Sequence, residues 1–270
     1  MYPTIIKIGW FELHSYGLFL AIAFLSGIYI AVKNAGKIGF DPNIIMNSSM
    51  IIIISSLIGS RFLYVIFHLN EFKGNYLDII NPFQSSGEFG IAGLTMLGGL
   101  IFAILSVLFY VKIKRTSFFV IADILSPSVA LGIGITRIGC FLNGCCFGKE
   151  CNLPWGVVFH PDSPAGYYFY NKHIHPTQLY SALGGFLIFF ILTYMKKYKL
   201  SIGFIFFSFV FLYSINRFII DFFRYYEKEM VLFTLKNVGI SVNQTICIGL
   251  FLFSLVFIVF KLLRMKKQDN

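Results

Sequence analysis

Charged residues are scarce in this sequence. Only 13% of the 270 residues are Asp, Glu, Lys or Arg, which is about half the share in an average soluble domain. Acidic residues are the scarcer kind, with 12 against 22 Lys and Arg, while 57% of the chain is apolar. So much apolar surface cannot be buried in one soluble core. The composition excludes a water-soluble globular protein and a disordered chain, and it indicates a polytopic membrane protein.

The chain also lacks a concentrated basic patch, although its formal net charge is +10. A nucleic-acid-binding protein gathers its basic residues on one surface together with accessible aromatic side chains. Here the basic residues stand in short clusters between apolar runs. We therefore expect no nucleic-acid partner, and we attribute the charge to membrane topology.

Seven apolar runs are long enough to cross a bilayer, which takes about 20 residues. The runs predict an all-α, polytopic integral membrane protein that forms a single domain over residues 1–270. No pattern of a cleavable signal peptide precedes the first run. The seven predicted transmembrane helices lie near residues 15–33, 46–67, 90–113, 118–139, 177–195, 202–222 and 243–263.

The orientation follows from the connecting segments. Twelve Lys and Arg fall on the side that includes the C-terminal tail, and seven fall on the other side, which also carries most of the acidic residues. Because basic loops stay in the cytoplasm, we expect the N-terminus outside and the C-terminus in the cytoplasm. The longest connecting segment, about residues 140–176, is then an external loop region, and loops of that length are often functional.

Three arginines, Arg61, Arg137 and Arg217, fall inside predicted spans. Asp221 follows Arg217 by four residues, so both lie on one helical face, and Arg224 extends this face toward the outer interface. Arginine at membrane depth costs several kcal/mol unless it lines a cavity or is paired. A group of arginines near the outer leaflet suits a lipid phosphate. The alternative, strongest for Arg224, is that the side chain only reaches for the headgroups.

Tyrosine, glycine and histidine residues are further candidates for the functional site. Tyr16 begins the first span directly after His14. The pairs Gly98-Gly99 and Gly184-Gly185 permit close approach of a helix to another helix or to a ligand, and helix packing is the expected role of the second pair. All five histidines fall at the outer side, where they can also be ordinary interfacial residues.

Four of the five cysteines are Cys140, Cys145, Cys146 and Cys151. Structural zinc uses pairs of ligands from two segments and only one segment is present, so we expect no metal and no cofactor. A disulfide is possible on an oxidising face, although adjacent cysteines rarely bridge each other. A thiol with a pKa lowered by Arg137 is a third interpretation. Packing at a tight glycine-containing turn is the fourth and the favoured one.

Taken in order along nearly the whole chain, the motifs resemble the prolipoprotein diacylglyceryl transferase family. The motifs are individually weak, and their joint order within seven spans carries the resemblance. They are His14-Ser15-Tyr16-Gly17, Gly59-Ser60-Arg61 with Tyr64-Val65, Leu97-Gly98-Gly99-Leu100, Asp123 with Pro127, Arg137-Ile138-Gly139 through Gly148, Leu153-Pro154-Trp155-Gly156, His175-Pro176-Thr177-Gln178-Leu179-Tyr180, and Arg217 with Asp221 and Arg224.

The resemblance implies transfer of a diacylglyceryl group from phosphatidylglycerol to the lipobox cysteine thiol of a prolipoprotein, with release of glycerol phosphate. It implies a bacterial cytoplasmic membrane protein among membrane lipids, with its active site toward the outer leaflet. Preorganised cations stabilise a phosphate leaving group. The implied catalytic residues are Arg137, Arg217, Tyr16 and Asp221, and the implied substrate-binding residues are Arg61, Gly98, Gly99, Asn143, Gly148, His175, Gln178 and Arg224.

The sequence departs from the family pattern where a proton must be handled. The family's HGG motif reads Leu97-Gly98-Gly99, an asparagine position holds Cys140, an acidic position holds Cys145, and a glutamate position holds Ser181. The general base is therefore open among Asp221, His14 and His175. Two alternatives remain: a paralogue that lipidates another acceptor, and a non-catalytic lipid-binding or transporting protein. The absence of an internal repeat argues against transport.

Overall fold

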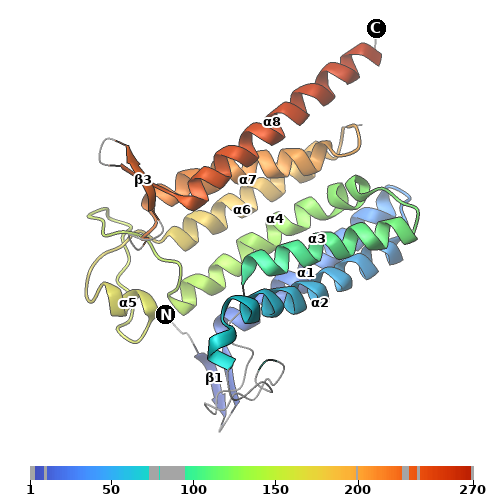
Figure 1. Cartoon of the computed structure of the whole chain (residues 1–270). Helices are drawn as coiled ribbons and strands as arrows, with labels where there is room; N and C mark the ends of the chain where they lie inside the picture. The colour runs from blue at the N-terminus through green and yellow to red at the C-terminus, as the bar shows by residue number, and fades with distance from the viewer. Residues whose placement is uncertain are drawn as a thin grey trace. The chain divides into compact units, whose positions relative to one another are not determined.

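The computed structural model describes residues 4–8, 11–72, 79, 95–198, 200–226, 231–235 and 238–268. These residues include seven helices that are long and apolar enough to cross a membrane, which confirms the predicted all-α membrane protein. Residues 90–94, predicted to begin the third span, lie outside the described residues. The helices are α1 (Ser15–Lys37), α2 (Pro42–Phe67), α3 (Met96–Ile113), α4 (Phe118–Asn143), α6 (Thr177–Met195), α7 (Phe204–Phe223) and α8 (Val242–Gln268) (Figure 1).

Short elements that the sequence analysis missed precede two of these helices. Strands β1 (Thr4–Ile8) and β2 (Phe11–His14) form an antiparallel hairpin that runs directly into α1. Strands β3 (Val231–Leu235) and β4 (Val238–Ser241) form a second hairpin that runs directly into α8. The 3₁₀ helix η1 (Leu69–Phe72) and the short helix α5 (Pro164–Tyr168) complete the described elements.

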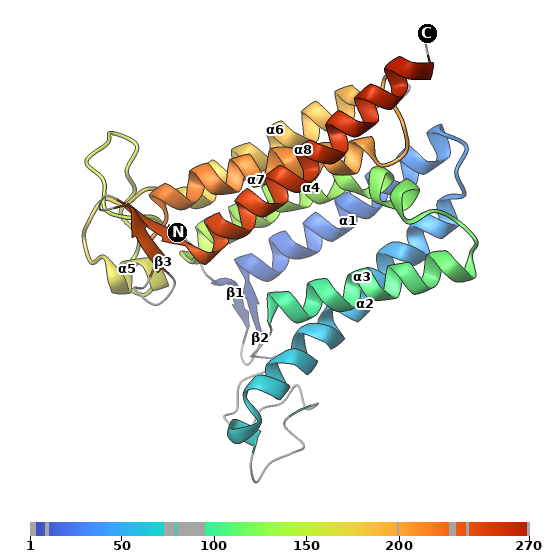
Figure 2. The ribbon, with the colours of Figure 1, turned by 45° about the horizontal axis from the view of Figure 1, so that its top comes forward.

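The chain divides into two compact units, residues 32–121 and residues 1–31 with 122–270. In the first unit, α2 and α3 lie side by side (Figure 2), and glycines stand where they approach each other. A Cβ on Gly98 would lie 2.7 Å from the Cβ of Leu63, and a Cβ on Gly99 would lie 3.1 Å from the carbonyl oxygen of Ser56. The glycines therefore bring the two helices together, as small residues do in membranes. A single domain over residues 1–270 stays a prediction.

The second unit holds α4, α6, α7 and α8. A Cβ on Gly185 of α6 would lie 2.7 Å from the backbone nitrogen of Gly134 in α4, so this glycine packs helix on helix as predicted. Asp123 of α4 accepts hydrogen bonds from the backbone N–H groups of Gly203 (2.6 Å) and Phe206 (2.7 Å). Its carboxylate thereby satisfies the free donors at the start of α7. These contacts hold α4, α6 and α7 in a fixed arrangement.

Candidate active site

The segment after α4 is fixed between α6 and α7 by backbone hydrogen bonds. The N–H of Gly148 donates to the carbonyl of His175 over 3.1 Å, and the N–H of Lys149 donates to the carbonyl of Phe223 over 2.9 Å. Gly148 also forms an antiparallel bridge with Arg224. A Cβ on Gly148 would lie 2.6 Å from the Cβ of His175, so this position needs glycine. The predicted residues Gly148, His175 and Arg224 are therefore neighbours through their backbones.

The cysteine-containing turn begins where α4 ends. Gly144 and Cys146 both have a positive φ, 75° and 62°, a conformation that glycine adopts freely and cysteine rarely does. Two buried side chains at the start of α6 hold the turn: Thr177 Oγ1 donates to the carbonyl of Cys146 over 2.9 Å, and Gln178 Nε2 donates to the carbonyl of Cys145 over 2.8 Å. The start of α6 thus holds the backbone of the turn at two consecutive carbonyls.

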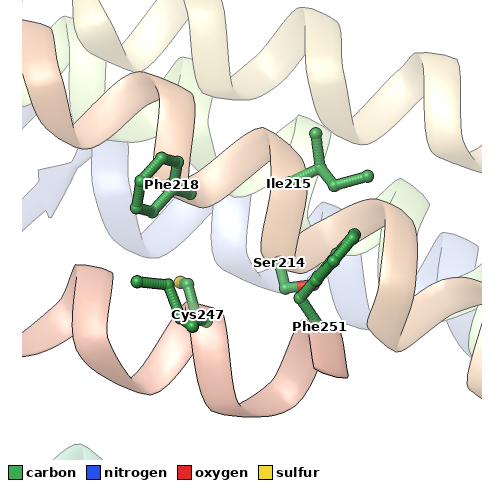
Figure 3. A pocket seen from close by; sticks show the side chains of 6 residues that line it. Ser214, Ile215, Phe218, Cys247 and Phe251 are labelled. Atoms are coloured by element: carbon green, nitrogen blue, oxygen red, sulfur yellow. The ribbon is translucent and has the colours of Figure 1, made fainter. Parts of the chain in front are cut away.

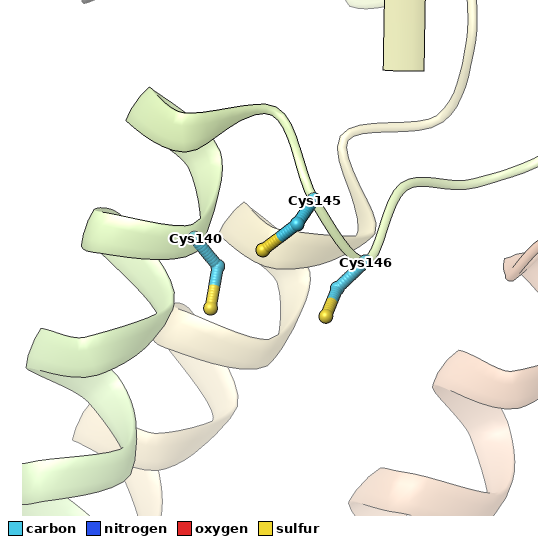
Figure 4. Close-up of side chains that lie close together, drawn as sticks. All are labelled: Cys140, Cys145 and Cys146. Carbon is cyan, nitrogen blue, oxygen red and sulfur yellow. The ribbon is translucent and has the colours of Figure 1, made fainter. Parts of the chain in front are cut away.

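This turn brings three sulfur atoms together. The side chains of Cys140, Cys145 and Cys146 extend to the same side of the chain (Figure 4), and their Sγ atoms all lie within 4.8 Å of one another. Cys140 is buried, whereas Cys145 and Cys146 are half-buried. All five cysteines of the chain are free thiols. The linear spacing did not predict this convergence, because it depends on the positive φ at Gly144 and Cys146.

Two predicted arginines and the predicted tyrosine interact with the cysteines. Hydrogen bonds from Cys140 and Cys145 lower the pKa of the Cys146 thiol, and the positive charges of Arg224 and Arg137 lower it further, against the effect of burial. The nearby positive charges therefore favour the thiolate form of Cys146. Tyr16 interacts electrostatically with the same three cysteines and with Arg137. The structure thus brings Tyr16, Arg137 and Arg224 to one cluster.

The predicted pair Arg217 and Asp221 forms a buried ion pair in α7. Arg217 Nη2 lies 3.0 Å from Asp221 Oδ1 and donates to the hydroxyl of Tyr226 over 2.8 Å. The Tyr226 hydroxyl donates to Asp221 Oδ1 over 2.8 Å, and Ser241 Oγ donates to Asp221 Oδ2 over 3.0 Å. Both carboxylate oxygens are occupied. Asp221 therefore orients Arg217 and is not placed as a free base.

Tyr226 connects this pair to the arginine next along the chain. The guanidinium carbon of Arg224 lies 5.2 Å from the centre of the Tyr226 ring, within the range of a cation–π interaction. Asn243 Nδ2 also donates to the Tyr226 hydroxyl, over 3.1 Å, and burial raises the pKa of Tyr226. Sequence reasoning missed Tyr226, Ser241 and Asn243. Only Ser241 carried a signal, because it begins a capping box with Gln244 at the start of α8.

Three further predicted residues, Asn143, His175 and His14, have contacts of their own. Asn143 is the last residue of α4 and its side chain interacts with Cys145. His175 Nδ1 lies 3.2 Å from the Tyr180 hydroxyl, and burial together with Lys149 lowers the pKa of His175. The imidazole is therefore neutral at pH 7. His14 lies 4.0 Å from Glu12 at the end of β2.

Three predicted residues belong to the unit formed by residues 32–121: Arg61, Gly98 and Gly99. Arg61 Nε donates to the carbonyl of Ile79 over 3.0 Å, and its guanidinium carbon lies 5.2 Å from the centre of the Phe72 ring. Gly98 and Gly99 are buried in the packing of α3 on α2. Their role in substrate binding stays a prediction.

An apolar cavity lies between α7 and α8, one helical turn from Arg217. Its volume is about 210 Å³. Ser214 turns its hydroxyl to the carbonyl of Phe211 over 2.8 Å, so the side chains shown in Figure 3 present an apolar surface. Such a cavity accepts hydrocarbon and not a headgroup. The lining residues are Ser214, Ile215, Phe218, Cys247, Ile248 and Phe251.

Fold and site together define a class of protein: a polytopic membrane protein with guanidinium groups, phenols and thiols gathered where helices α1, α4, α6 and α7 begin or end. Residues 3–260 match the sequence profile of the family described as Prolipoprotein diacylglyceryl transferase. The chain belongs to this family.

Several relatives of this chain have names that correspond to the matched family. The chain is 33% identical over 258 residues to the phosphatidylglycerol–prolipoprotein diacylglyceryl transferase of Clostridium tetani, which covers 94% of this chain and 98% of the relative. It is 33% identical to the protein of the same name from Fusobacterium nucleatum, covering 83% of this chain and 88% of the relative. The Bacillus cytotoxicus protein of this name is 30% identical, covering 94% and 90%.

Proposed function

We propose that this protein transfers a diacylglyceryl group from phosphatidylglycerol to the thiol of a prolipoprotein lipobox cysteine. Family membership and the names of the relatives support this activity. The observation that carries it is that Arg137 and Arg224, from different helix ends, both interact electrostatically with Cys146. Two cations at one point favour an anionic ligand such as a lipid phosphate.

In the proposed reaction the acceptor sulfur attacks the glyceryl carbon that carries the phosphate. A carbon–sulfur bond forms, the carbon–oxygen bond breaks, and its electron pair leaves with glycerol phosphate. Negative charge grows on the departing phosphate, so cations already in place lower the barrier. Arg137 and Arg217 supply this stabilisation, Arg224 and Arg61 position the headgroup, and Tyr16 donates a hydrogen bond to it. The remaining predicted contacts with the substrates are Gly98, Gly99, Asn143, Gly148, His175 and Gln178.

Asp221 acts through Arg217 in this proposal. Its two oxygens bind Arg217, Tyr226 and Ser241, and this network fixes the guanidinium before the substrate arrives. A cation that is oriented in advance does not reorganise during the reaction. Asp221 is therefore a positioning residue.

The proposed location is the bacterial cytoplasmic membrane, with the site facing the outer leaflet. The excess of Lys and Arg in the segments on the C-terminal side supports this orientation. The seven apolar helices support a multi-pass protein. The acyl chains of the donor then lie among the helices, and the apolar cavity beside Arg217 offers room for a segment of chain.

The test uses purified protein, phosphatidylglycerol vesicles and a synthetic lipobox peptide. We expect a peptide with a thioether-linked diacylglyceryl group, detected by mass spectrometry, and no product from the same peptide with serine in place of cysteine. Arg137→Ala should reduce the rate by about 100-fold. Arg264→Ala, at the opposite end of α8, is the matched control and should retain the wild-type rate. No product from folded wild-type protein, or an unchanged rate in Arg137→Ala, would contradict the proposal.

A further inference from the structure

The three convergent sulfurs have the composition of a catalytic metal site. Zinc in catalytic sites takes three protein ligands and leaves a fourth position for water or substrate. Cys140, Cys145 and Cys146 supply three soft ligands within 4.8 Å of one another. Sulfurs bound about 2.3 Å from a tetrahedral zinc stand about 3.8 Å apart. The distances between the three sulfurs, all within 4.8 Å, exceed this spacing by at most about 1 Å.

Hydrogen bonds fix the backbone that carries the three sulfurs, and a preorganised metal site requires such fixed ligands. Thr177 and Gln178, each 1% exposed, bind the carbonyls of Cys146 and Cys145. The N–H of Cys145 donates to the carbonyl of Cys140 over 3.2 Å. The rare positive φ of Cys146 is unfavourable for a residue with a side chain and persists only where the surroundings enforce it. These contacts preorganise all three sulfurs on one side of the turn.

The charge balance also suits a metal thiolate. Zinc with three thiolates carries a net charge of −1, and a fourth thiolate makes it −2. Arg137 and Arg224 both interact with Cys146, so two positive charges stand beside this anionic centre. Arg137 also makes a side-chain hydrogen bond to Cys146, and outer contacts of this kind orient the ligands at other metal sites.

We propose that Cys140, Cys145 and Cys146 bind a zinc ion whose fourth ligand is the acceptor cysteine thiol of the prolipoprotein. This inference rests on the proposed function, because it assigns the site's acceptor step. A thiol has an ordinary pKa near 8.5, and coordination to a metal deprotonates it outright. The site therefore generates the attacking sulfur without a separate general base.

The step balances without a redox change. The acceptor thiol releases its proton to water on coordination, and the zinc-bound thiolate attacks the glyceryl carbon. The carbon–sulfur bond forms as the carbon–oxygen bond breaks, and glycerol phosphate leaves with the electron pair, stabilised by Arg137 and Arg217 as in the proposed function. The thioether product is neutral and binds zinc weakly. It dissociates, and water or the next acceptor thiol takes its place.

Metal content tests the site independently of activity. Full-length protein is purified under reducing conditions, loaded with Zn²⁺, desalted and analysed by mass spectrometry for metals. We expect about one zinc per chain in the wild type and in Cys151→Ser, which removes a buried cysteine of the same loop. Cys140→Ser and Cys146→Ser should lose the zinc. Stoichiometric zinc in both of these variants, or none in folded wild type, would overturn the inference.

Cobalt reports the fourth ligand. Co²⁺ in the same site should show thiolate-to-metal charge-transfer bands, and addition of the lipobox peptide should strengthen these bands and shift the ligand-field bands. The peptide with serine in place of cysteine should leave the spectrum unchanged. An unchanged spectrum with the cysteine peptide would overturn the assignment of the acceptor as a ligand.

Chelation separates this inference from the proposed function. A competing chelator should reduce transfer at least about tenfold, and added Zn²⁺ should restore it, without any substitution that could impair folding. Full transfer by metal-free protein would overturn the zinc site and leave the proposed function standing. Bound metal with the expected cobalt response, but no transfer from phosphatidylglycerol, would support the site and contradict the proposed function.

Discussion

At the scale of single residues, the candidate site depends on side chains whose partners are already in place. Asp221 is 4% exposed and its two oxygens receive three donors. Removing one partner of a buried ion pair is strongly destabilising, because the other charge is then buried without a counter-charge. Arg217 therefore depends on Asp221 for its charge balance and for its orientation.

Asp221→Asn keeps the size of the side chain and removes its charge. We expect the free energy of unfolding to fall by about 3 kcal/mol, and we expect kcat to fall at least about tenfold because Arg217 loses its fixed orientation. Thermal unfolding in detergent and the transfer assay measure the two effects. Asp162→Asn, at an exposed loop residue that faces His160, should change neither. A wild-type kcat in Asp221→Asn would contradict the positioning role.

Gly144 shows how one backbone conformation shapes the cysteine turn. Its φ is +75°, and an added Cβ would lie 2.6 Å from the Cβ of Ser163. For any residue with a side chain, this backbone conformation and the clash with Ser163 both lower the free energy of unfolding.

Gly144→Ala should lower the free energy of unfolding by about 2 kcal/mol and should displace the cysteines that follow. The expected readouts are a lower midpoint of thermal unfolding and a reduced transfer rate. Gly132→Ala in α4 is the matched control, because an added Cβ there meets nothing within 4 Å. It should leave the midpoint unchanged or raise it, since alanine favours helix. Equal midpoints for Gly144→Ala and the wild type would refute this argument.

At the scale of elements, contacts at helix ends join segments that are distant in sequence. The start of α6 holds the cysteine turn through Thr177 and Gln178. Ser241, the cap of α8, binds Asp221 of α7. Asp123 of α4 binds the start of α7. Buried backbone donors need such partners, so the helix ends are specified by polar contacts while the helix faces are mostly apolar.

Asp123 offers a test of these contacts away from the candidate site. Asp123→Ala removes the acceptor of two N–H groups at the start of α7 and should cost about 2 kcal/mol of unfolding free energy. Asp123→Asn keeps an acceptor and should cost clearly less. Thermal unfolding midpoints of the two variants measure the difference. If both variants match the wild type, the carboxylate does not stabilise α7.

At the scale of the whole molecule, the lysines that follow α6 and end α8 lie at other helix ends than the candidate site. Arg224 and the cysteine turn follow the C-terminal ends of α7 and α4, whereas Lys196 follows α6 and Lys261 lies in the last part of α8. Burial lowers the pKa of Lys196 to about 8. The clustered lysines therefore mark the side that we assign to the cytoplasm.

A reporter fused after Lys267 tests this orientation in cells. We expect a cytoplasmic signal from this fusion and an external signal from a reporter inserted after Asp162, in the loop between α4 and α6. The two positions serve as controls for each other, because the proposed orientation places them on opposite sides of the membrane and the two reporters must therefore give opposite signals. Reversed signals would overturn the assignment of the site to the outer leaflet.

By itself, the sequence determined the class of membrane protein, the seven spans and the arginines worth following. Apolar runs and charge bias are local properties of the chain, and lipid imposes them directly. The spacing of Arg217 and Asp221 likewise predicted a shared helical face, because helical geometry is local.

Only the tertiary structure decided what these residues contact. Tyr226 and Ser241 complete the Arg217–Asp221 network from outside α7, and no local pattern indicates that meeting. The convergence of Cys140, Cys145 and Cys146 depends on two positive φ angles and on hydrogen bonds from α6. The spacing of cysteines in the sequence does not determine where their side chains point. A segment whose spacing does not match a metal site can therefore still bring three sulfurs together when its backbone forms a tight turn.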